Sequence, residues 1–280
     1  MSTAATGASS FRPRSGVLRP IVALVRRDFQ IRRSYRIAFA LDLSLGFLNL
    51  LIYFFISRTF VGASTESLGG APSYFAFALI GIVLTVVIQA ATTEIAHVLR
   101  QEQLTGTLEA LATQPVSPTQ LSVGLAALPV VFAMLRVVFY IAIGVVWLDL
   151  DVGGASWSGL LAVLLATGLA MLGVGIAACA VVLLVKRGEI LVGMVMFGMG
   201  LLGGAFFPVS VLPSWLEALG RVVPTRFAFD GARDAIFTGG GWCDDVAFLL
   251  LFSVVVLPLS LLFFREALAA ARRMGSLGQY

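Results

Sequence analysis

Apolar runs of about 20 residues are the feature that most constrains this chain. Such a run crosses a hydrocarbon layer ~30 Å thick as an α-helix, and lipid tolerates no spanning backbone other than helices and closed barrels. Of the 280 residues, 59% are hydrophobic and 12% are charged, and the mean hydropathy is +0.98. A soluble globular domain carries roughly twice that share of charge, and a disordered chain is poor in hydrophobic residues. The sequence therefore predicts a multi-spanning membrane protein.

The apolar runs predict an all-α integral membrane protein with six transmembrane helices, because the alternating pattern of barrel strands is absent. The predicted spans are Ala38–Ser57, Ser73–Thr93, Val123–Trp147, Leu160–Leu184, Ile190–Phe207 and Val246–Phe264. Residues 1–17, rich in Ser, Ala and Gly, are expected to form a flexible cytoplasmic tail. Residues 18–280 are expected to form a single six-span domain.

The basic residues predict the orientation. One side of the predicted spans carries 14 of the 19 basic residues and the other side carries Arg58, Arg221, Arg226 and Arg233, with Arg136 inside a span. Because basic residues gather on the cytoplasmic side, both termini are predicted to be cytoplasmic. The pI near 9.5 is explained by this bias, and no nucleic-acid partner is expected.

The segment Leu18–Ser34 predicts an amphipathic helix that lies along the inner membrane surface. Its apolar residues fall on one helical face and its arginines on the other. The alternative is a plain basic flank to the first span, which would not require the apolar spacing.

The connector between the second and third spans predicts a short rigid helix on the cytoplasmic side. Helix breakers bracket a leucine pair there, with Gly106 before it, Pro115 and Pro118 after it, and Leu108 and Leu111 on one helical face. A solvated connector is the alternative, but a connector of that kind has no need for a leucine pair between breakers.

The segment between the fifth and sixth spans predicts two further short helices, on the outer side. The first lies between Pro208 and Gly220, and the second follows Pro224 and stops at Gly239. Proline at a helix start and glycine at its end is the usual asymmetry. Each helix is too short to cross and too apolar for a free loop. We therefore expect a re-entrant hairpin before the last span, shielded by protein.

The motif Gly106-Thr107-Leu108-Glu109, followed by Pro115-Val116-Ser117-Pro118, and the outer segments Phe207–Pro213 and Pro224–Arg233 have counterparts in one family. They resemble the cytoplasmic loop and the outer-loop signature of type-2 ABC exporter permeases. The six-span layout is similar to that family from about Leu18 to Tyr280. The two loop motifs together are more specific than either alone.

The resemblance implies the transmembrane subunit of an ATP-driven exporter that moves an amphipathic, lipid-linked, drug-like or glycan substrate out across the bacterial cytoplasmic membrane. It implies a separate cytoplasmic P-loop ATPase, which binds ATP and magnesium. It also implies a second permease copy, which forms a homodimer with this chain in the lipid bilayer. The residues implied to couple to the ATPase are Glu102, Gly106, Thr107, Leu108, Glu109 and Leu111. Those implied to form an outer re-entrant gate are Phe207, Pro208, Leu212, Pro213, Trp215, Pro224 and Arg233.

The residues themselves indicate where the energy must enter. The sequence contains no Gly-x-x-x-x-Gly-Lys-[Ser/Thr] loop to cradle phosphates. ATP energy is therefore expected to enter through a second polypeptide, and this chain is not expected to be an enzyme. One histidine, His97, and two separated cysteines give no set for a metal or a catalytic triad. No catalytic residue, metal site or cofactor is expected in this chain.

Arg136 lies in the middle of the third predicted span, where a charge costs at least ~2.5–3.5 kcal/mol unless it faces protein or water. It either lines a substrate path or has a structural role, and the sequence leaves both open. Asp42 is a poor candidate for its partner, because Asp42 is about 6 Å and Arg136 about 20 Å from the cytoplasmic end of their spans, at ~1.5 Å per residue.

Two other classes of function compete with an ABC permease. A stand-alone secondary transporter or channel usually carries several ionisable residues inside the membrane, and here Asp42 and Arg136 alone lie within the predicted spans. An intramembrane enzyme needs convergent acids, histidines or a serine pair, which the sequence does not show. The secondary transporter or channel is the main alternative.

Overall fold

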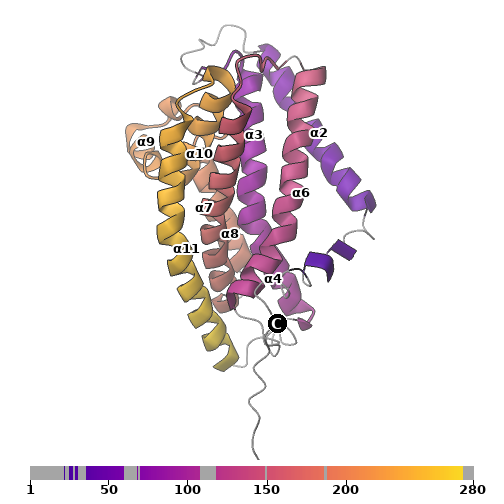
Figure 1. The fold of residues 1–280 in the computed structure, drawn as a ribbon, viewed down its shortest axis with the longest axis vertical. Coiled ribbons are helices and arrows are strands. Elements are labelled where there is room, and N and C mark those ends of the chain that lie inside the picture. The colour runs from indigo at the N-terminus through magenta and orange to yellow at the C-terminus, as the bar shows by residue number, and fades with distance from the viewer. Residues whose placement is uncertain are drawn as a thin grey trace, which may run out of the picture.

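The computed structural model describes residues 36–59, 68, 70–107, 118–148, 150–185 and 188–273, and near the N-terminus residues 22, 25–27, 29 and 30. Within these residues the fold is all-α, as predicted, and no strand occurs. Figure 1 shows a bundle of long helices that run along the longest axis of the molecule. The predicted tail, residues 1–17, and most of Leu18–Ser34 lie outside the described residues.

The helices follow one another without intervening sheet. Their bounds are α2 (Arg36–Thr59), α3 (Tyr74–Ala91), α4 (Thr93–Leu104), α6 (Pro118–Trp147), α7 (Trp157–Leu184), α8 (Gly188–Leu202), the 3-10 turn η2 (Val209–Val211), α9 (Ser214–Gly220), α10 (Pro224–Arg233), the π-helix η3 (Asp234–Thr238) and α11 (Trp242–Arg273). We refer to the end of the bundle where α4 finishes as the α4 end, and to the opposite end, which holds α9 and α10, as the α10 end (Figure 1).

Among the described residues, five stretches of helix are long and apolar enough to cross a membrane. They are Phe39–Thr59, Tyr74–Leu104, Thr119–Trp147, Trp157–Leu184 and Trp242–Ala271. Each contains one of the predicted spans or most of it, and the chain is a multi-pass membrane protein. The 32 residues of α11 extend over about 48 Å, so this helix is longer than a hydrocarbon layer of ~30 Å.

The fifth predicted span, Ile190–Phe207, differs from the structure. Helix α8 has 15 residues and ends at Leu202, so it rises about 22 Å and is shorter than the hydrocarbon layer. The chain turns at Gly203 and Gly204, and Gly204 takes φ of 82°, a left-handed value that glycine adopts without a steric cost. The hydropathy pattern does not reveal the turn at these glycines, because the residues around them are apolar.

Carbonyl groups at the end of α8 and in the turn that follows lie within reach of α10, although the Met199 carbonyl also accepts from the Gly203 N–H at 2.9 Å. Side chains of α10 donate to them: Thr225 Oγ1 to the carbonyl of Met199 at 2.6 Å, and Arg233 Nη2 to the carbonyl of Gly204 at 2.8 Å. An unpaired buried carbonyl costs about as much as a lost hydrogen bond. The short helix α10 therefore binds the end of α8 through its side chains.

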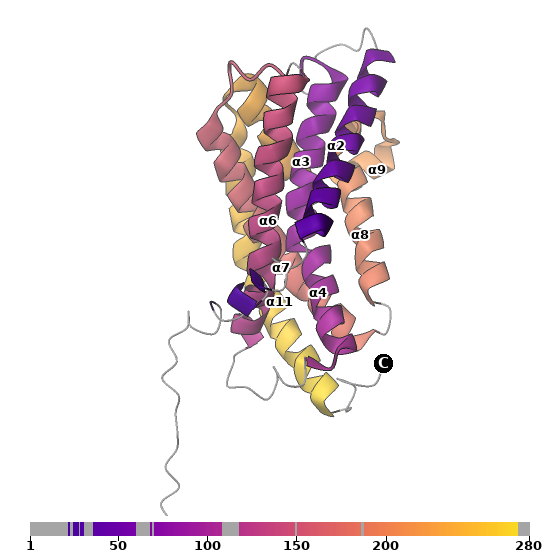
Figure 2. The ribbon, with the colours of Figure 1, turned by 90° about the vertical axis from the view of Figure 1, so that its right-hand side faces the viewer.

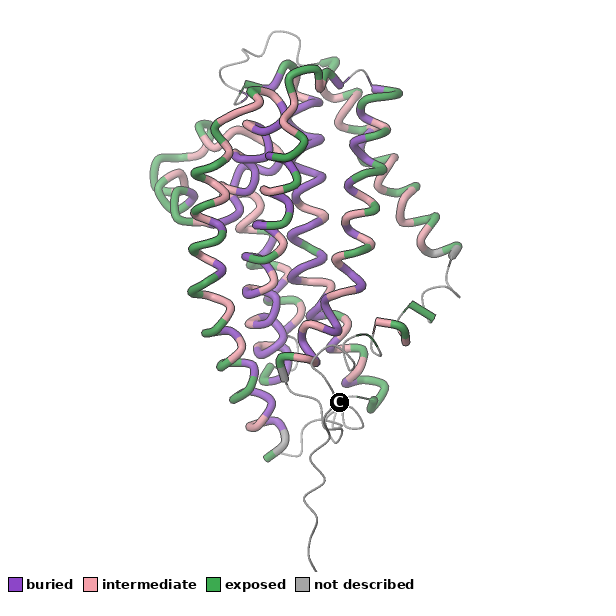
Figure 3. The backbone as a smooth tube through the Cα atoms, in the orientation of Figure 1, coloured by how far each residue is buried: buried purple, intermediate pink, exposed green. Residues whose placement is uncertain are grey.

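Helix α7 lies at the centre of the packing, in contact with α3, α4, α8, α10 and most extensively α11. Its small residues let other backbones approach closely. At Gly175 a Cβ atom would lie 2.0 Å from the carbonyl oxygen of Ala91, at the junction of α3 and α4. The buried residues in Figure 3 follow α3 and α7 through the bundle.

Helix α2 stands at the periphery. It contacts α3 and α6, but almost none of its apolar stretch is buried, as its pink and green tube shows (Figure 3). One stripe along it is exposed and apolar: Ile37, Leu41, Leu45, Leu48, Ile52 and Phe55. In a membrane protein such a stripe faces lipid or another subunit.

The close approach at Gly175 gives a stability prediction. Gly175→Ala is expected to lower the free energy of unfolding by roughly 1–3 kcal/mol, because the added methyl group forces α7 away from the Ala91 carbonyl. Thermal unfolding of the purified protein in detergent measures this. Gly193→Ala in α8 is the control, since a Cβ atom there meets nothing within 4 Å. Equal effects of the two substitutions would contradict the packing described.

Candidate functional site at the α4 elbow

A bend at Thr92 sets the direction of α4. The helix of the second span does not stop at the predicted Thr93 but breaks at Thr92, which has φ −125° and ψ −79°, and resumes as α4. The buried Thr92 hydroxyl donates to the carbonyl of Ile88 at 2.6 Å, and such back-bonding bends helices. Together α3 and α4 form one bent rod, and we call the bend and α4 the α4 elbow (Figure 2).

One face of α4 is anchored in the bundle. Ile95, Leu99 and Gln103 are buried and follow one another at intervals of four residues, so they share one helical face. The first two belong to a separate apolar cluster at the α4 end, which includes Leu125 of α6 and Phe264 of α11. Helix α4 therefore packs directly on α6 and α7, and the same apolar cluster extends to α11.

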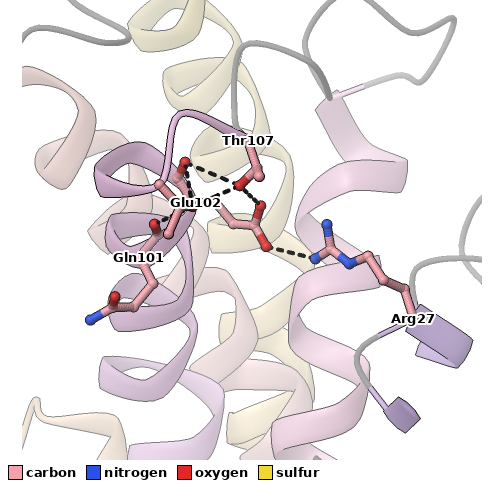
Figure 4. A network of polar contacts seen from close by, with 5 residues as sticks. Arg27, Gln101, Glu102 and Thr107 are labelled. Atoms are coloured by element: carbon pink, nitrogen blue, oxygen red, sulfur yellow. Dashed lines mark hydrogen bonds and ion pairs between the residues drawn. The ribbon is translucent and has the colours of Figure 1, made fainter. Parts of the chain in front are cut away.

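A polar network surrounds Glu102 near the end of α4 (Figure 4). Its carboxylate accepts from Arg27 Nη2 at 2.6 Å and from the Thr107 hydroxyl. Thr107 Oγ1 also lies 2.9 Å from Thr105 Oγ1, which donates to the carbonyl of Gln101 at 2.9 Å. One carboxylate thus binds the segment before the first span to the start of the connector that follows α4.

Gly106 ends the helical run, as the sequence predicts. It takes φ of 72°, and its N–H donates to the carbonyl of Gln103 at 3.1 Å. A left-handed residue directly after the cap is a common way to end a helix and is usually glycine. A Cβ atom here would meet nothing within 4 Å, so glycine is required by the backbone conformation and not by a neighbour.

A second ion-pair group lies next to the bend, at the first turn of α4. Arg136 of α6 binds Asp42 of α2, with Nη2 2.6 Å from Oδ2, and Glu94 of α4, with Nη1 3.2 Å from Oε1. The Arg136 side chain is mostly buried, whereas Asp42 is about half exposed. Three helices are therefore joined through one guanidinium group.

The expectation that Asp42 is too shallow to reach Arg136 is wrong. It assumed that the first and third spans begin at the same level. In the structure α6 begins at Pro118 beside α4, whereas α2 begins at Arg36 farther from the α4 end (Figures 1 and 2). This offset brings Asp42 level with Arg136.

The predicted coupling residues are placed only in part. Glu102, Gly106 and Thr107 lie together at the end of α4, and Thr107 has helical conformation. The other three, Leu108, Glu109 and Leu111, lie outside the described residues, and so does the short helix predicted there.

The predicted outer gate residues do not form one cluster. Pro224 and Arg233 are buried in α10, and Pro208 lies with Arg233 at one cavity. Phe207 and Leu212 are half-buried, whereas Pro213 and Trp215 are exposed on the surface of the α10 end. The two short helices occur where the sequence predicts them, as α9 and α10.

Sequence reasoning missed Arg27 and Glu94 as partners in these networks. Arg27 is one of the arginines of the predicted amphipathic helix Leu18–Ser34 and counts toward the predicted orientation, and Glu94 follows directly after the predicted end of the second span at Thr93. The available signal was the run from Thr93 to Leu104, which contains no proline or glycine and continues the helix past the predicted boundary. A helix of that length puts Glu94 within the bundle.

These features define a multi-pass helical membrane protein with a charged elbow at one end, a class that includes the membrane subunits of transporters. A protein-family model described as ABC-2 type transporter matches residues 19–237, well over half of the chain. The chain belongs to the ABC-2 type transporter family. No curated protein matches the sequence.

Membership defines the chain as the permease component of an ABC transporter. It is a transport component and not itself catalytic, and it pairs with a cytoplasmic ATP-binding subunit that hydrolyses ATP.

The Arg136 group gives a second stability prediction. Asp42→Asn and Glu94→Gln each leave Arg136 one carboxylate, so each is expected to cost no more than about 1 kcal/mol. The double variant leaves a mostly buried guanidinium group without an anion and is expected to cost about 3 kcal/mol, more than the sum of the single changes. Unfolding in detergent measures all three. Strictly additive costs would show that Arg136 does not depend on the two acids jointly.

Proposed function

We propose that this permease works in an exporter that moves an amphipathic, lipid-linked, drug-like or glycan substrate out across the bacterial cytoplasmic membrane. ATP and magnesium bind to the partner subunit, and the ATPase acts on the connector that begins at Gly106. The observation that best supports this role is that Glu102 binds both Arg27 and Thr107 at the end of the elbow. Force applied there reaches the bundle core directly, because α4 is buried along one face.

The arginine-rich α4 end is the cytoplasmic end in this proposal. Arg27, Arg100, Arg265 and Arg273 belong to the segments that gather there. Helix α8, followed by η2, α9 and α10, takes the place of the fifth span, so the chain crosses six times and both termini are cytoplasmic. The hairpin of α9 and α10 then lies in the outer leaflet, and its hydrogen bonds to the end of α8 support a re-entrant arrangement.

A homodimer of permeases is the proposed assembly. The exposed apolar stripe of α2 supports it, because the stripe runs along nearly the whole helix from Ile37 to Phe55. Cysteine crosslinking at Leu45 in native membranes distinguishes a second copy from lipid, since only a second copy gives a crosslinked dimer.

Arg136 has a structural role in this proposal and does not line the path. Two carboxylates already occupy its guanidinium group, which leaves it little capacity to bind a substrate. Substrate identity depends on other parts of the bundle.

Charge reversal tests the role of the elbow. Glu102→Arg and Arg27→Glu are each expected to reduce co-purification with the ATPase, and ATP hydrolysis by the complex, roughly fivefold, which corresponds to about 1 kcal/mol. Each places like charges 2.6 Å apart in the native geometry, so the connector is released. The double variant Arg27→Glu/Glu102→Arg restores the pair and is expected to recover most of the loss.

Glu189→Gln is the matched control, because Glu189 is a carboxylate at the same end that pairs with His97 at 3.6 Å and is not part of the Glu102 network. Its co-purification and hydrolysis are expected to equal those of the wild type. Failure of the double variant to recover function would show that the pair does not act as a unit. Transport by the purified chain on an ion gradient, with no ATPase present, would overturn the proposed function and favour a secondary transporter.

A further inference from the structure

A cavity of about 430 Å³ opens at the α10 end, remote from the elbow. Helix α10, the π-helix η3, the turn η2 and the start of α3 surround it. The polar side chains in its wall include Arg226, Arg233, Asp230 and Asp234, and the apolar wall includes Phe77 and Pro208. Small-molecule sites in proteins span about 300–1,000 Å³, and this cavity lies near the lower limit.

Both arginines in the wall retain unsatisfied donors. Arg226 Nη1 and Arg233 Nε are buried and have no hydrogen-bond partner among the described residues. Leaving a buried donor unpaired costs roughly 1–3 kcal/mol, and more when the group is charged. The unmet requirement at this cavity is therefore for acceptor atoms.

Arg233 is fixed in place and charged. Its Nη2 donates to the carbonyl of Gly204 at 2.8 Å, and its guanidinium carbon lies 3.6 Å from the centroid of the Phe77 ring. A guanidinium group stays protonated in proteins at neutral pH, so Arg233 carries a positive charge. A rigid cation at the wall of a small cavity is suited to binding an anion.

The acid that faces both arginines satisfies neither of them fully. Asp230 Oδ2 lies 3.4 Å from Arg226 Nε, and Asp230 Oδ1 lies 3.9 Å from Arg233 Nη1. Charge-assisted hydrogen bonds of this type are usually ~2.7–2.9 Å long. Asp230 thus acts as a loose internal substitute for an anion with better-placed oxygens.

We propose that this cavity, formed by Arg226 and Arg233 beside Asp230, binds an anionic phosphate or carboxylate group. Its size suits a headgroup or a small anion and not a long chain. The group belongs either to a lipid headgroup or to a free anion, and the site would hold it at the end of the bundle opposite the ATPase-facing elbow. The inference does not depend on the direction of transport.

Thermal unfolding of the full chain in nanodiscs tests the proposal with two probes. One arm titrates inorganic phosphate into phosphatidylcholine nanodiscs, with sodium chloride at equal ionic strength as the reference. The other arm compares phosphatidylcholine nanodiscs with nanodiscs that contain phosphatidic acid. Binding raises the midpoint temperature in a ligand-dependent way. A shift in the first arm identifies a free-anion site, and a shift in the second arm alone identifies a headgroup site.

Three variants assign the shift to this cavity. Arg226→Gln is expected to weaken binding about tenfold or more, because it removes one charged donor. Asp230→Asn is expected to strengthen binding, because it removes the internal competitor. Arg221→Gln is the matched control and is expected to change nothing, since Arg221 is exposed at the same end and pairs with Glu217 at 2.9 Å.

Absence of a shift with both probes overturns the proposal. So does a shift that Arg221→Gln reduces as much as Arg226→Gln, because binding would then reflect general surface charge. Weaker anion binding in Asp230→Asn would also contradict it, since Asp230 would then contribute to binding and not compete with the anion. Asp230→Asn keeps the test independent of whether variants at the deeply buried Arg233 fold.

Discussion

Hydrocarbon supplies no hydrogen-bond partners, and this constraint explains the contacts at two places where helices of the bundle bend or end. Where the second span bends, the Thr92 hydroxyl bonds within its own helix. Where α8 ends, Thr225 and Arg233 of α10 donate to the carbonyl groups of Met199 and Gly204. Helix α10 therefore stabilises the end of α8, although neither α9 nor α10 is long enough to cross a membrane.

The α4 elbow combines two kinds of attachment. Its apolar face packs on α6 and α7, in a cluster that extends to α11. Its acidic residues bind arginines at both of its ends, Glu94 to Arg136 and Glu102 to Arg27. Packing is non-directional, but the ion pairs fix the rotation of α4 about its own axis. A permease that receives work from a separate ATPase needs a part that is both rigid and connected to several helices, and the elbow has these properties.

Much of the fold was predictable from the sequence because hydropathy and helix breakers act locally. The five long helices, the break at Gly106 and the two short outer helices follow from runs and breakers that are contiguous in the chain. The early end of α8 did not follow, because Gly203 and Gly204 count as neutral in an apolar run. The prediction that Asp42 does not pair with Arg136 was wrong for a different reason. It depended on how far α2 and α6 are offset along the bundle, and this offset is a tertiary property. The pairing of Arg27 with Glu102, 75 residues apart, likewise leaves no local trace.

The bend at Thr92 gives α4 the geometry of a lever. With 12 residues, α4 is about 18 Å long from its fulcrum to its tip. A swing of about 10° would carry the tip through about 3 Å, a displacement comparable to one side-chain contact. In the proposed coupling, a small movement of the ATP-binding subunit would therefore be enough to change the side-chain contacts around the end of α4.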